Sequence, residues 1–360
     1  MTLSRLRTNT ALTVIAAALL MAAPVAAEQP EAVVAGDLAR NHVIPASTAL
    51  AEAAGRLDDS LATGCAELAS ARAAYHAAMD AWMGLQHVNF GPITYLQRDS
   101  RLYFWPDKTG AMSKQLARAL KAADPALLEP ETLARGSVAL QGLPVLERLL
   151  FPAKPPAGDP AYRCALTRAV AGSIATIARG LLADWRDGDR PYAILIEQAD
   201  QDDALFESSL EVVGLFLRSL DQGLLVVDEL RLGRPLGDGG SRPRPRRAES
   251  WRSERSGRNV KLVLKALADM AAPAGGGGFA GLLEAYGEAA LAGALRQRVS
   301  AVLAAAGALG DSLFDAVEDA GRRPVVEALR AEVRETRALV TAEIAPALGV
   351  TIGFNSLDGD

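Results

Sequence analysis

The residues that could act together in chemistry are few in this 360-residue chain, which has only three histidines and two cysteines. His76, Asp80 and His87 follow one another at offsets of four and seven residues, which would place the three side chains on one stripe of a helix. Two imidazoles and a carboxylate can hold a divalent metal. However, His76 and His87 would lie roughly 16 Å apart along the helix axis. That is too far to share one ion, so an ordinary polar helix face is the favoured interpretation.

Established catalytic signatures are missing from the sequence. It contains no HExxH, no GxSxG and no GxxxxGK[ST] motif. The Gly275–Gly278 run lacks the lysine of a phosphate loop and is interpreted as a flexible connection. Oxygen ligands for Ca²⁺ or Fe³⁺ could come from Asn355, Asp358 and Asp360, although Asx turns also explain these residues.

Two unusual segments offer binding surfaces instead. Residues 90–110 concentrate aromatic side chains in a chain that has only 5% of them, and they include Arg101 and Trp105. Such a segment could line a ligand cleft or plug the end of a helical bundle. Residues 231–258 contain nine arginines. They could bind an anionic partner or form a solvated connector, and the connector is favoured.

The N-terminus has the pattern of an export signal. Arg5 and Arg7 precede the apolar stretch 11–23, and Val25-Ala26-Ala27 offers small residues for cleavage before Glu28. The apolar stretch is shorter than the ~20 residues of a membrane span. We therefore expect a periplasmic protein with no transmembrane span after cleavage of residues 1–27, with a retained N-terminal anchor as the alternative.

The two cysteines fit an exported protein. In an oxidising compartment, Cys65 and Cys164 are most simply interpreted as one disulfide, although two buried thiols would also satisfy the count. Neither has a neighbour at the spacing of a metal ligand.

Composition and periodicity predict an all-α fold. Hydrophobic residues make up 50% of the chain, and apolar positions recur at three- and four-residue spacing, as in Leu210, Val213, Leu217 and Leu220. No segment alternates as a strand would. We expect two tandem helical bundles with long ordered loops, over residues 28–188 and 189–360. The net charge of −5 argues against a nucleic-acid partner.

Several motifs together resemble the imelysin-like family, which is named after an insulin-cleaving membrane protease and includes iron-regulated envelope proteins. They are HVIPASTALAEAA at His42, AWMGLQHVNFGPI at Ala81, RLYFWPDKTG at Arg101, QGLPVLERLLF at Gln141, ESWRSERSGRNVKLVLKAL at Glu249 and LGVTIGFNSLDGD at Leu348. The resemblance covers about residues 35–348. It implies two related helical bundles, an envelope location and a link to iron acquisition.

The chain departs from the family at its hallmark, GxHxxE. Gly142 and Glu147 are kept, but Pro144 stands at the histidine position. Proline has no side-chain donor atom, so the sequence resembles a divergent branch in which the metal site is lost or rebuilt. Glu147 stays a metal-ligand candidate, and a helix-end or salt-bridge role is the alternative.

The resemblance favours a non-catalytic binding or accessory protein of iron or other metal uptake. The alternatives are a metal-dependent peptidase and an envelope interaction scaffold. The expected ligand is iron, another divalent metal or a small molecule, and an envelope protein is a further expected partner. The residues expected in the cleft are His42, Arg101, Trp105, Gly142, Glu147, Arg252 and Asn259.

Overall fold

The computed structural model describes residues 29–352, except for 67, 155–157 and 238–241. The predicted signal peptide, its cleavage position and the terminal Asn355, Asp358 and Asp360 lie outside the described residues. Within them every regular element is a helix, and no strand is present. The all-α prediction is confirmed.

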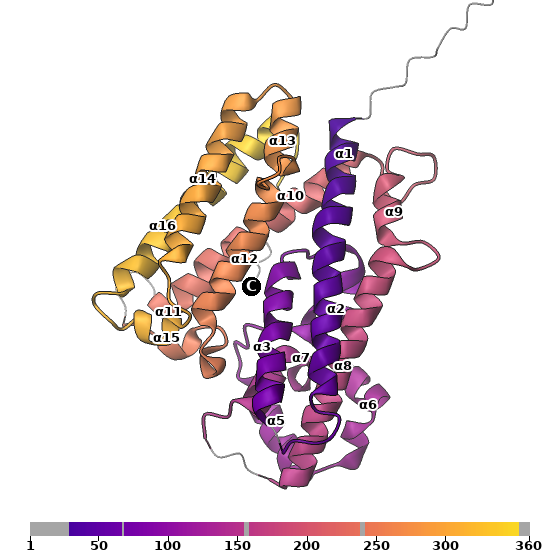
Figure 1. Ribbon diagram of the computed structural model, residues 1–360, viewed down its shortest axis with the longest axis vertical. Helices are drawn as coiled ribbons and strands as arrows, with labels where there is room; N and C mark the ends of the chain where they lie inside the picture. The colour runs from indigo at the N-terminus through magenta and orange to yellow at the C-terminus, as the bar shows by residue number, and fades with distance from the viewer. Residues whose placement is uncertain (1–28, 67, 155–157, 238–241, 353–360) are drawn as a thin grey trace, which may run out of the picture.

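The first half of the chain builds one bundle of helices, drawn from indigo to magenta in Figure 1. Their bounds are α1 (Pro30–Asp37), α2 (Ile44–Asp59), α3 (Leu68–Leu85), α7 (Gly142–Leu150) and α8 (Pro160–Arg186). Helix α2 packs against α3 and α8, and α7 packs against α3 and α8. Buried apolar side chains such as Leu50, Leu57, Met79 and Ile174 fill the space between them.

The second half builds another bundle, drawn from salmon to yellow in Figure 1. Its main helices are α10 (Ser209–Leu225), α12 (Ser256–Ala271), α13 (Gly278–Ala285), α14 (Ala289–Gly307) and α16 (Arg323–Leu339). Helix α14 packs against α16, α12 and α13. The bundles meet where α12 contacts α3, and α1 also contacts α10 and α13.

The remaining elements connect the helices of the two bundles. The other α-helices are α4 (Arg98–Leu102), α5 (Ala111–Ala122), α6 (Pro130–Arg135), α9 (Tyr192–Glu197), α11 (Arg234–Leu236), α15 (Leu313–Ala316) and α17 (Ala345–Ala347). The 3₁₀ turns are η2 (Gly91–Gln97), η3 (Pro125–Leu128), η4 (Val138–Leu140), η6 (Pro245–Arg247) and η7 (Trp251–Ser253). The π-helical segments are η1 (Leu38–Val43), η5 (Val226–Gly233) and η8 (Val340–Ile344).

Local features of the sequence set several helix limits. Pro45 lies in the first turn of α2, where a missing amide donor is tolerated, and α2 follows the π-helical segment η1 without a break. Gly287, at φ +85°, separates α13 from α14. Residues 202–208 precede α10, which begins after Ser208; the Ser208 side chain accepts a hydrogen bond from the amide of Glu211.

The disulfide prediction is confirmed. Cys65, just before α3, is bonded to Cys164 on α8, with the two Cα atoms 5.7 Å apart. The bond ties α8 to the start of α3. By length and apolar composition α8 is the one described helix that could cross a membrane, and half of its most apolar window is buried inside the protein.

Candidate functional site at the junction of the bundles

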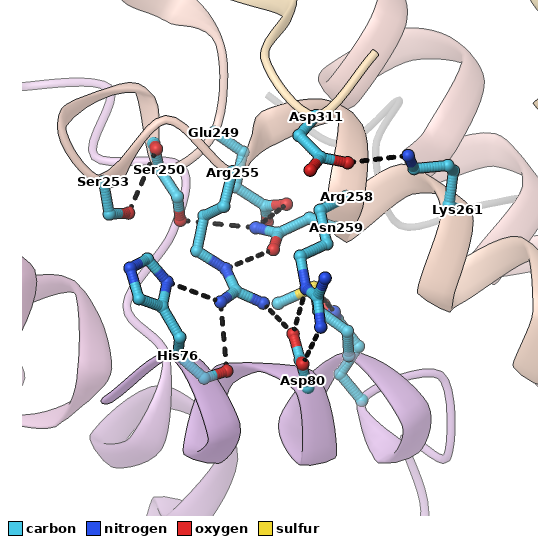
Figure 2. Close-up of polar contacts among 12 residues, drawn as sticks. His76, Asp80, Glu249, Ser250, Ser253, Arg255, Arg258, Asn259, Lys261 and Asp311 are labelled. Atoms are coloured by element: carbon cyan, nitrogen blue, oxygen red, sulfur yellow. Dashed lines mark hydrogen bonds and ion pairs between the residues drawn. The ribbon is translucent and has the colours of Figure 1, made fainter. Parts of the chain in front are cut away.

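A buried arginine joins the two bundles where α12 meets α3 (Figure 2). Arg255 directly precedes α12, and only 2% of its side chain is exposed. It donates from Nη2 to Asp80 Oδ1 at 2.5 Å, from Nη1 to the His76 carbonyl at 3.0 Å and from Nε to Asn259 Oδ1 at 2.7 Å. Since these partners come from both bundles, Arg255 fixes the position of α12 on α3.

His76 and Asp80 have protonation states that suit this arrangement. Arg255 Nη1 lies 3.0 Å from His76 Nδ1, and a guanidinium can only donate, so Nδ1 accepts and Nε2 carries the proton. Burial, then the nearby Arg255 charge, lowers the pKa of His76. For Asp80, burial alone would raise the pKa, but hydrogen bonds from Arg258 and Arg255 and their charges together lower it. The pair is thus a neutral imidazole beside a carboxylate.

A second buried ion pair lies beside the first. Arg231, at the end of η5, donates from Nε and Nη2 to the two oxygens of Glu249, at 2.9 and 3.0 Å. Both side chains are at most 2% exposed. Arg231 also donates to Gln86 Oε1 at 2.6 Å, and Asn259 donates to Glu249 Oε2 at 2.9 Å. Through Asn259 the two ion pairs form one network.

Glu147 reaches this junction from α7. Its Oε1 accepts from the Ser253 amide at 3.0 Å and from the Ser253 hydroxyl at 2.7 Å. Burial raises the pKa of Glu147, although the Ser253 hydrogen bonds and the charges of Arg252 and Arg148 oppose this effect. The side chain is therefore a link between α7 and η7.

The residues present do not fit the metal that the hallmark motif would hold. Pro144 offers no donor atom, and Glu147 is buried with Oε1 committed to Ser253. In the part of the chain that the structure describes, no group of three or more histidine, cysteine, aspartate or glutamate side chains could hold an ion. His76 and His87 do not lie on one helical stripe as expected, because α3 ends at Leu85, before His87.

The structure brings three of the expected cleft residues into one network. Ser250 lies between Glu147 and Asn259. Asn259 donates to Ser250 Oγ at 3.3 Å, and Ser253, whose single hydroxyl hydrogen is donated to Glu147 Oε1 at 2.7 Å, has its Oγ 3.2 Å from the Ser250 carbonyl oxygen. Trp105 joins through its ring, which lies under the Arg231 guanidinium, 5.3 Å from ring centroid to Cζ.

The other expected cleft residues make different contacts. Arg101 donates to Gln141 Oε1 at 3.0 Å. Gly142, at φ +78°, lies so close to the Arg101 and Leu102 carbonyls that a Cβ would approach them within 2.5 Å. It therefore serves close packing of α7 on α4. Arg252 stacks on Trp251 at 4.4 Å and its pKa is lowered by burial to about 10.

His42 pairs with His87 and not with Glu147. Their Nε2 atoms lie 2.7 Å apart, so one ring donates and the other accepts. Burial lowers the pKa of both residues, that of His87 well below its ordinary value. Both rings are thus neutral at physiological pH.

The key arginines of the junction were not expected from the sequence. The sequence favours a solvated connector for residues 231–258, but Arg231 and Arg255 are buried ion-pair partners, while Arg242, Arg244, Arg246 and Arg247 are exposed. The signal that could have found Arg255 is the motif ESWRSERSGRN, which carries Glu249, Ser253, Arg255 and Asn259 within eleven residues.

A cavity of about 510 Å³ opens beside the network. It lies between the end of α3, the segment after α4 and the helix formed by α10 and η5, and its lining includes Trp82, Gln86, His87, Tyr103, Trp105 and Arg231. The junction therefore combines a network of buried ion pairs and hydrogen bonds with an aromatic-walled cavity.

The family model described as imelysin (peptidase M75) matches residues 43–340. The chain belongs to the imelysin family. A solved structure of an imelysin-like protein from Psychrobacter arcticus is similar over 90% of this chain and 97% of its own, with a TM-score of 0.74 and 22% identity. A protein described as an iron-regulated protein A precursor, from Parabacteroides distasonis, is similar over 86% of this chain and 94% of its own, with a TM-score of 0.70 and 14% identity. No curated protein sequence matches.

This membership confirms the fold inferred from the sequence motifs, and at these identities the solved structures bear on the fold alone. Within the imelysin fold, the chain keeps the glycine and glutamate of the hallmark motif and uses both for packing between elements.

Proposed function

We propose that this imelysin-family protein is a periplasmic, non-catalytic binding or accessory component of iron or other metal uptake. The observation that carries the proposal is the environment of Glu147, which is buried and hydrogen-bonded to Ser253, with Pro144 at the position of the hallmark histidine. A metal site of the hallmark type needs an imidazole as well as the carboxylate, and within the described residues no group of three or more histidine, cysteine, aspartate or glutamate side chains could hold an ion. The iron link is supported by family membership and by the iron-regulated precursor with the same fold.

The test of the non-catalytic role uses the mature protein recovered from its own periplasm. Casein and insulin B chain are incubated with the protein, with added Zn²⁺ or Fe²⁺ and with a chelator, and the products are analysed by mass spectrometry. We expect no cleavage, and we expect equal metal content in the wild type and in Glu147→Ala. Chelator-sensitive cleavage that Glu147→Ala abolishes would establish the peptidase alternative.

The test of the uptake role uses a deletion strain under iron limitation. Accumulation of radioactive iron should fall in the deletion strain and return when either the wild type or Glu147→Gln is supplied. Unchanged accumulation in the deletion strain would contradict the role in iron uptake. If the wild type restored iron accumulation and a stably folded Glu147→Gln protein did not, the carboxylate of Glu147 would have a role beyond structure, which would contradict the proposal. N-terminal sequencing of the periplasmic protein should begin at Glu28.

A scaffold for an acidic envelope protein is a second candidate, favoured by the exposed arginines Arg242, Arg244, Arg246 and Arg247. Contacts between exposed charges are screened by salt. A partner co-purified through this surface should therefore dissociate at about 0.5 M NaCl and be lost when the four arginines are changed to glutamine.

A further inference from the structure

The imidazole rings of His42 and His87 face each other with one nitrogen atom each. Their Nε2 atoms lie 2.7 Å apart, while the ring centroids lie 4.9 Å apart, so both Nε2 atoms lie between the two rings. Two nitrogen ligands are therefore within reach of one small group placed between the rings.

Different elements hold the two rings in place. His42 lies in the π-helical segment η1 and is partly exposed. Short π-helical turns are rare and occur frequently at functional sites. His87 lies two residues after the end of α3, and only 4% of it is exposed. The fold thus presents a partly exposed imidazole to a buried one.

Both rings are neutral, as a metal ligand must be. Burial lowers the pKa of His87 well below its ordinary value, and the neighbouring His42 adds to this effect. Burial also lowers the pKa of His42, against the opposing charges of Asp269 and Asp37. Because a metal ion binds only the unprotonated nitrogen of an imidazole, no charged ring has to lose its proton before an ion binds at neutral pH.

The protons of the pair can also adjust to an ion. Each neutral ring carries one N–H, and one of the two Nε2 atoms holds the proton of the hydrogen bond between them. An ion between the rings requires both protons on Nδ1. His87 Nδ1 has no hydrogen-bond partner among the described residues, so no donor keeps that nitrogen unprotonated. The proton can pass from Nε2 to Nδ1 of the same ring, and none is released to solvent.

An ion between the rings needs more room than the hydrogen bond. Two metal–nitrogen bonds of about 2.0 Å in line would place the Nε2 atoms about 4 Å apart, compared with 2.7 Å in the structure. His42 lines a hollow of about 460 Å³ between η1, the end of α3 and α12. This hollow gives the ring of His42 space to move back and gives the ion a way in.

The number of ligands selects the class of ion. Monovalent ions with a filled d shell, such as Cu⁺ and Ag⁺, commonly take two ligands in line, and imidazole is among the ligands that suit copper. Zn²⁺ takes four ligands. Among the described residues no group of three or more histidine, cysteine, aspartate or glutamate side chains could hold it. The carboxylates of Asp37 and Asp269 line the same hollow and favour a cation.

We propose that His42 and His87 form a site for a soft monovalent metal ion of the copper(I) class, bound in line between the two Nε2 atoms. The proposal deepens the proposed function, on which it rests for the use of the ion, because it gives a protein of metal uptake a pair of metal ligands that does not include Glu147.

The first experiment measures the binding of Ag⁺ to the purified mature protein. Silver(I) has the ligand preferences of copper(I) and is stable in air. Competing sulfur ligands are few, because both cysteines form the disulfide and the four methionines of the described chain are buried, namely Met79, Met83, Met112 and Met270. Calorimetry at pH 7 in a chloride-free buffer should show one tightly bound Ag⁺ per chain and an affinity for Zn²⁺ that is at least tenfold lower. No binding of Ag⁺, or equal affinities for Ag⁺ and Zn²⁺, would overturn the proposal.

A long-range ¹H–¹⁵N spectrum of the histidine rings locates the ion. The chain has three histidines, and His42→Phe and His87→Phe assign the signals of two of them. Silver nuclei have a spin of one-half, so a nitrogen atom bonded to Ag⁺ gives a split signal. The Nε2 signals of His42 and His87 should both split, while the signals of His76, whose ring contacts Arg255, should stay single. Binding of Ag⁺ without splitting at both His42 and His87 would contradict the proposed coordination.

Variants of the two rings complete the test. His42→Phe and His87→Phe each keep a ring but remove its nitrogen atoms, so each should reduce the affinity for Ag⁺ at least tenfold. Asn41→Ala changes an exposed neighbour on the same hollow and should leave the affinity unchanged.

Circular dichroism checks the fold of the variants. If the buried His87→Phe does not fold, His42→Phe, at a partly exposed position, decides the question alone. A wild-type affinity for Ag⁺ in a folded His42→Phe protein would refute the site. These measurements do not depend on the cleavage and iron-accumulation assays, so either proposal can fail alone.

Discussion

Glu147 on α7 accepts two hydrogen bonds from Ser253, a residue 106 positions later in the chain. The contact spans the two bundles, because α7 belongs to the first and Ser253, at the end of η7, lies three residues before the start of α12 of the second. In this protein the glutamate of the hallmark motif therefore links the two bundles. This structural role explains how Glu147 can be present although Pro144 stands at the histidine position of the motif.

Glu147→Gln tests the cost of the buried charge. Burial raises the folded-state pKa of Glu147, so its ionisation disfavours the folded state as pH rises from the unfolded value near 4.5 through the folded value. The free energy of unfolding of the wild type should therefore fall, relative to Glu147→Gln, as pH increases over this window. Urea titrations at pH 4 to 8 measure the difference. Glu254→Gln, at an exposed position, serves as the control. A free energy of unfolding of the wild type that rises with pH relative to that of Glu147→Gln would contradict the expectation.

Asp80→Asn tests the junction from the other side. Removal of the carboxylate charge leaves the buried Arg255 without its counter-charge, and because Asp80 is one-quarter exposed we expect a loss of about 2 kcal/mol, less than for a fully buried pair. The folded-state pKa of Asp80 is lowered, so its stabilisation is present above the unfolded value of about 3.8 and disappears as pH falls through the folded value.

Urea titrations from pH 7 downward should show wild type and Asp80→Asn converging in acid. Asp311→Asn, whose ion pair with Lys261 is largely exposed, should cost less than about 1 kcal/mol. Equal effects of the two substitutions would show that Asp80 acts only as a surface charge.

The helices were predictable because their information is local. Leu210, Val213 and Leu217 repeat at helical spacing, and a disulfide was the simplest interpretation of Cys65 and Cys164 in a chain predicted to be exported. The junction was not predictable, because the partners of its arginines lie far away in sequence. Arg255 is 175 residues from Asp80, and Arg231 is 145 residues from Gln86. A run of arginines has the same local pattern whether it is solvated or buried.

The Arg231–Glu249 pair should behave as a unit. Arg231→Met leaves Glu249 buried without its cation and should cost about 3–5 kcal/mol. Glu249→Gln in the same protein removes the unpaired charge while keeping an oxygen for Asn259, and we expect it to recover most of the loss. Urea unfolding of the two single variants and the double variant gives the coupling energy. A double variant whose loss equals the sum of the single losses would show that the residues are energetically independent.

Reduction of the disulfide should destabilise the protein through the unfolded chain. The bond joins residues 99 apart, and the chain-entropy model gives about 4–5 kcal/mol for a loop of that size. Thermal unfolding followed by circular dichroism should therefore show a lower Tm in the presence of dithiothreitol. The double variant Cys65→Ser/Cys164→Ser should unfold at the lowered Tm with or without the reductant. If complete reduction left the Tm of the wild type unchanged, the packing of α8 on α2 and α7 would be sufficient to hold the Cys164 end of α8 in place.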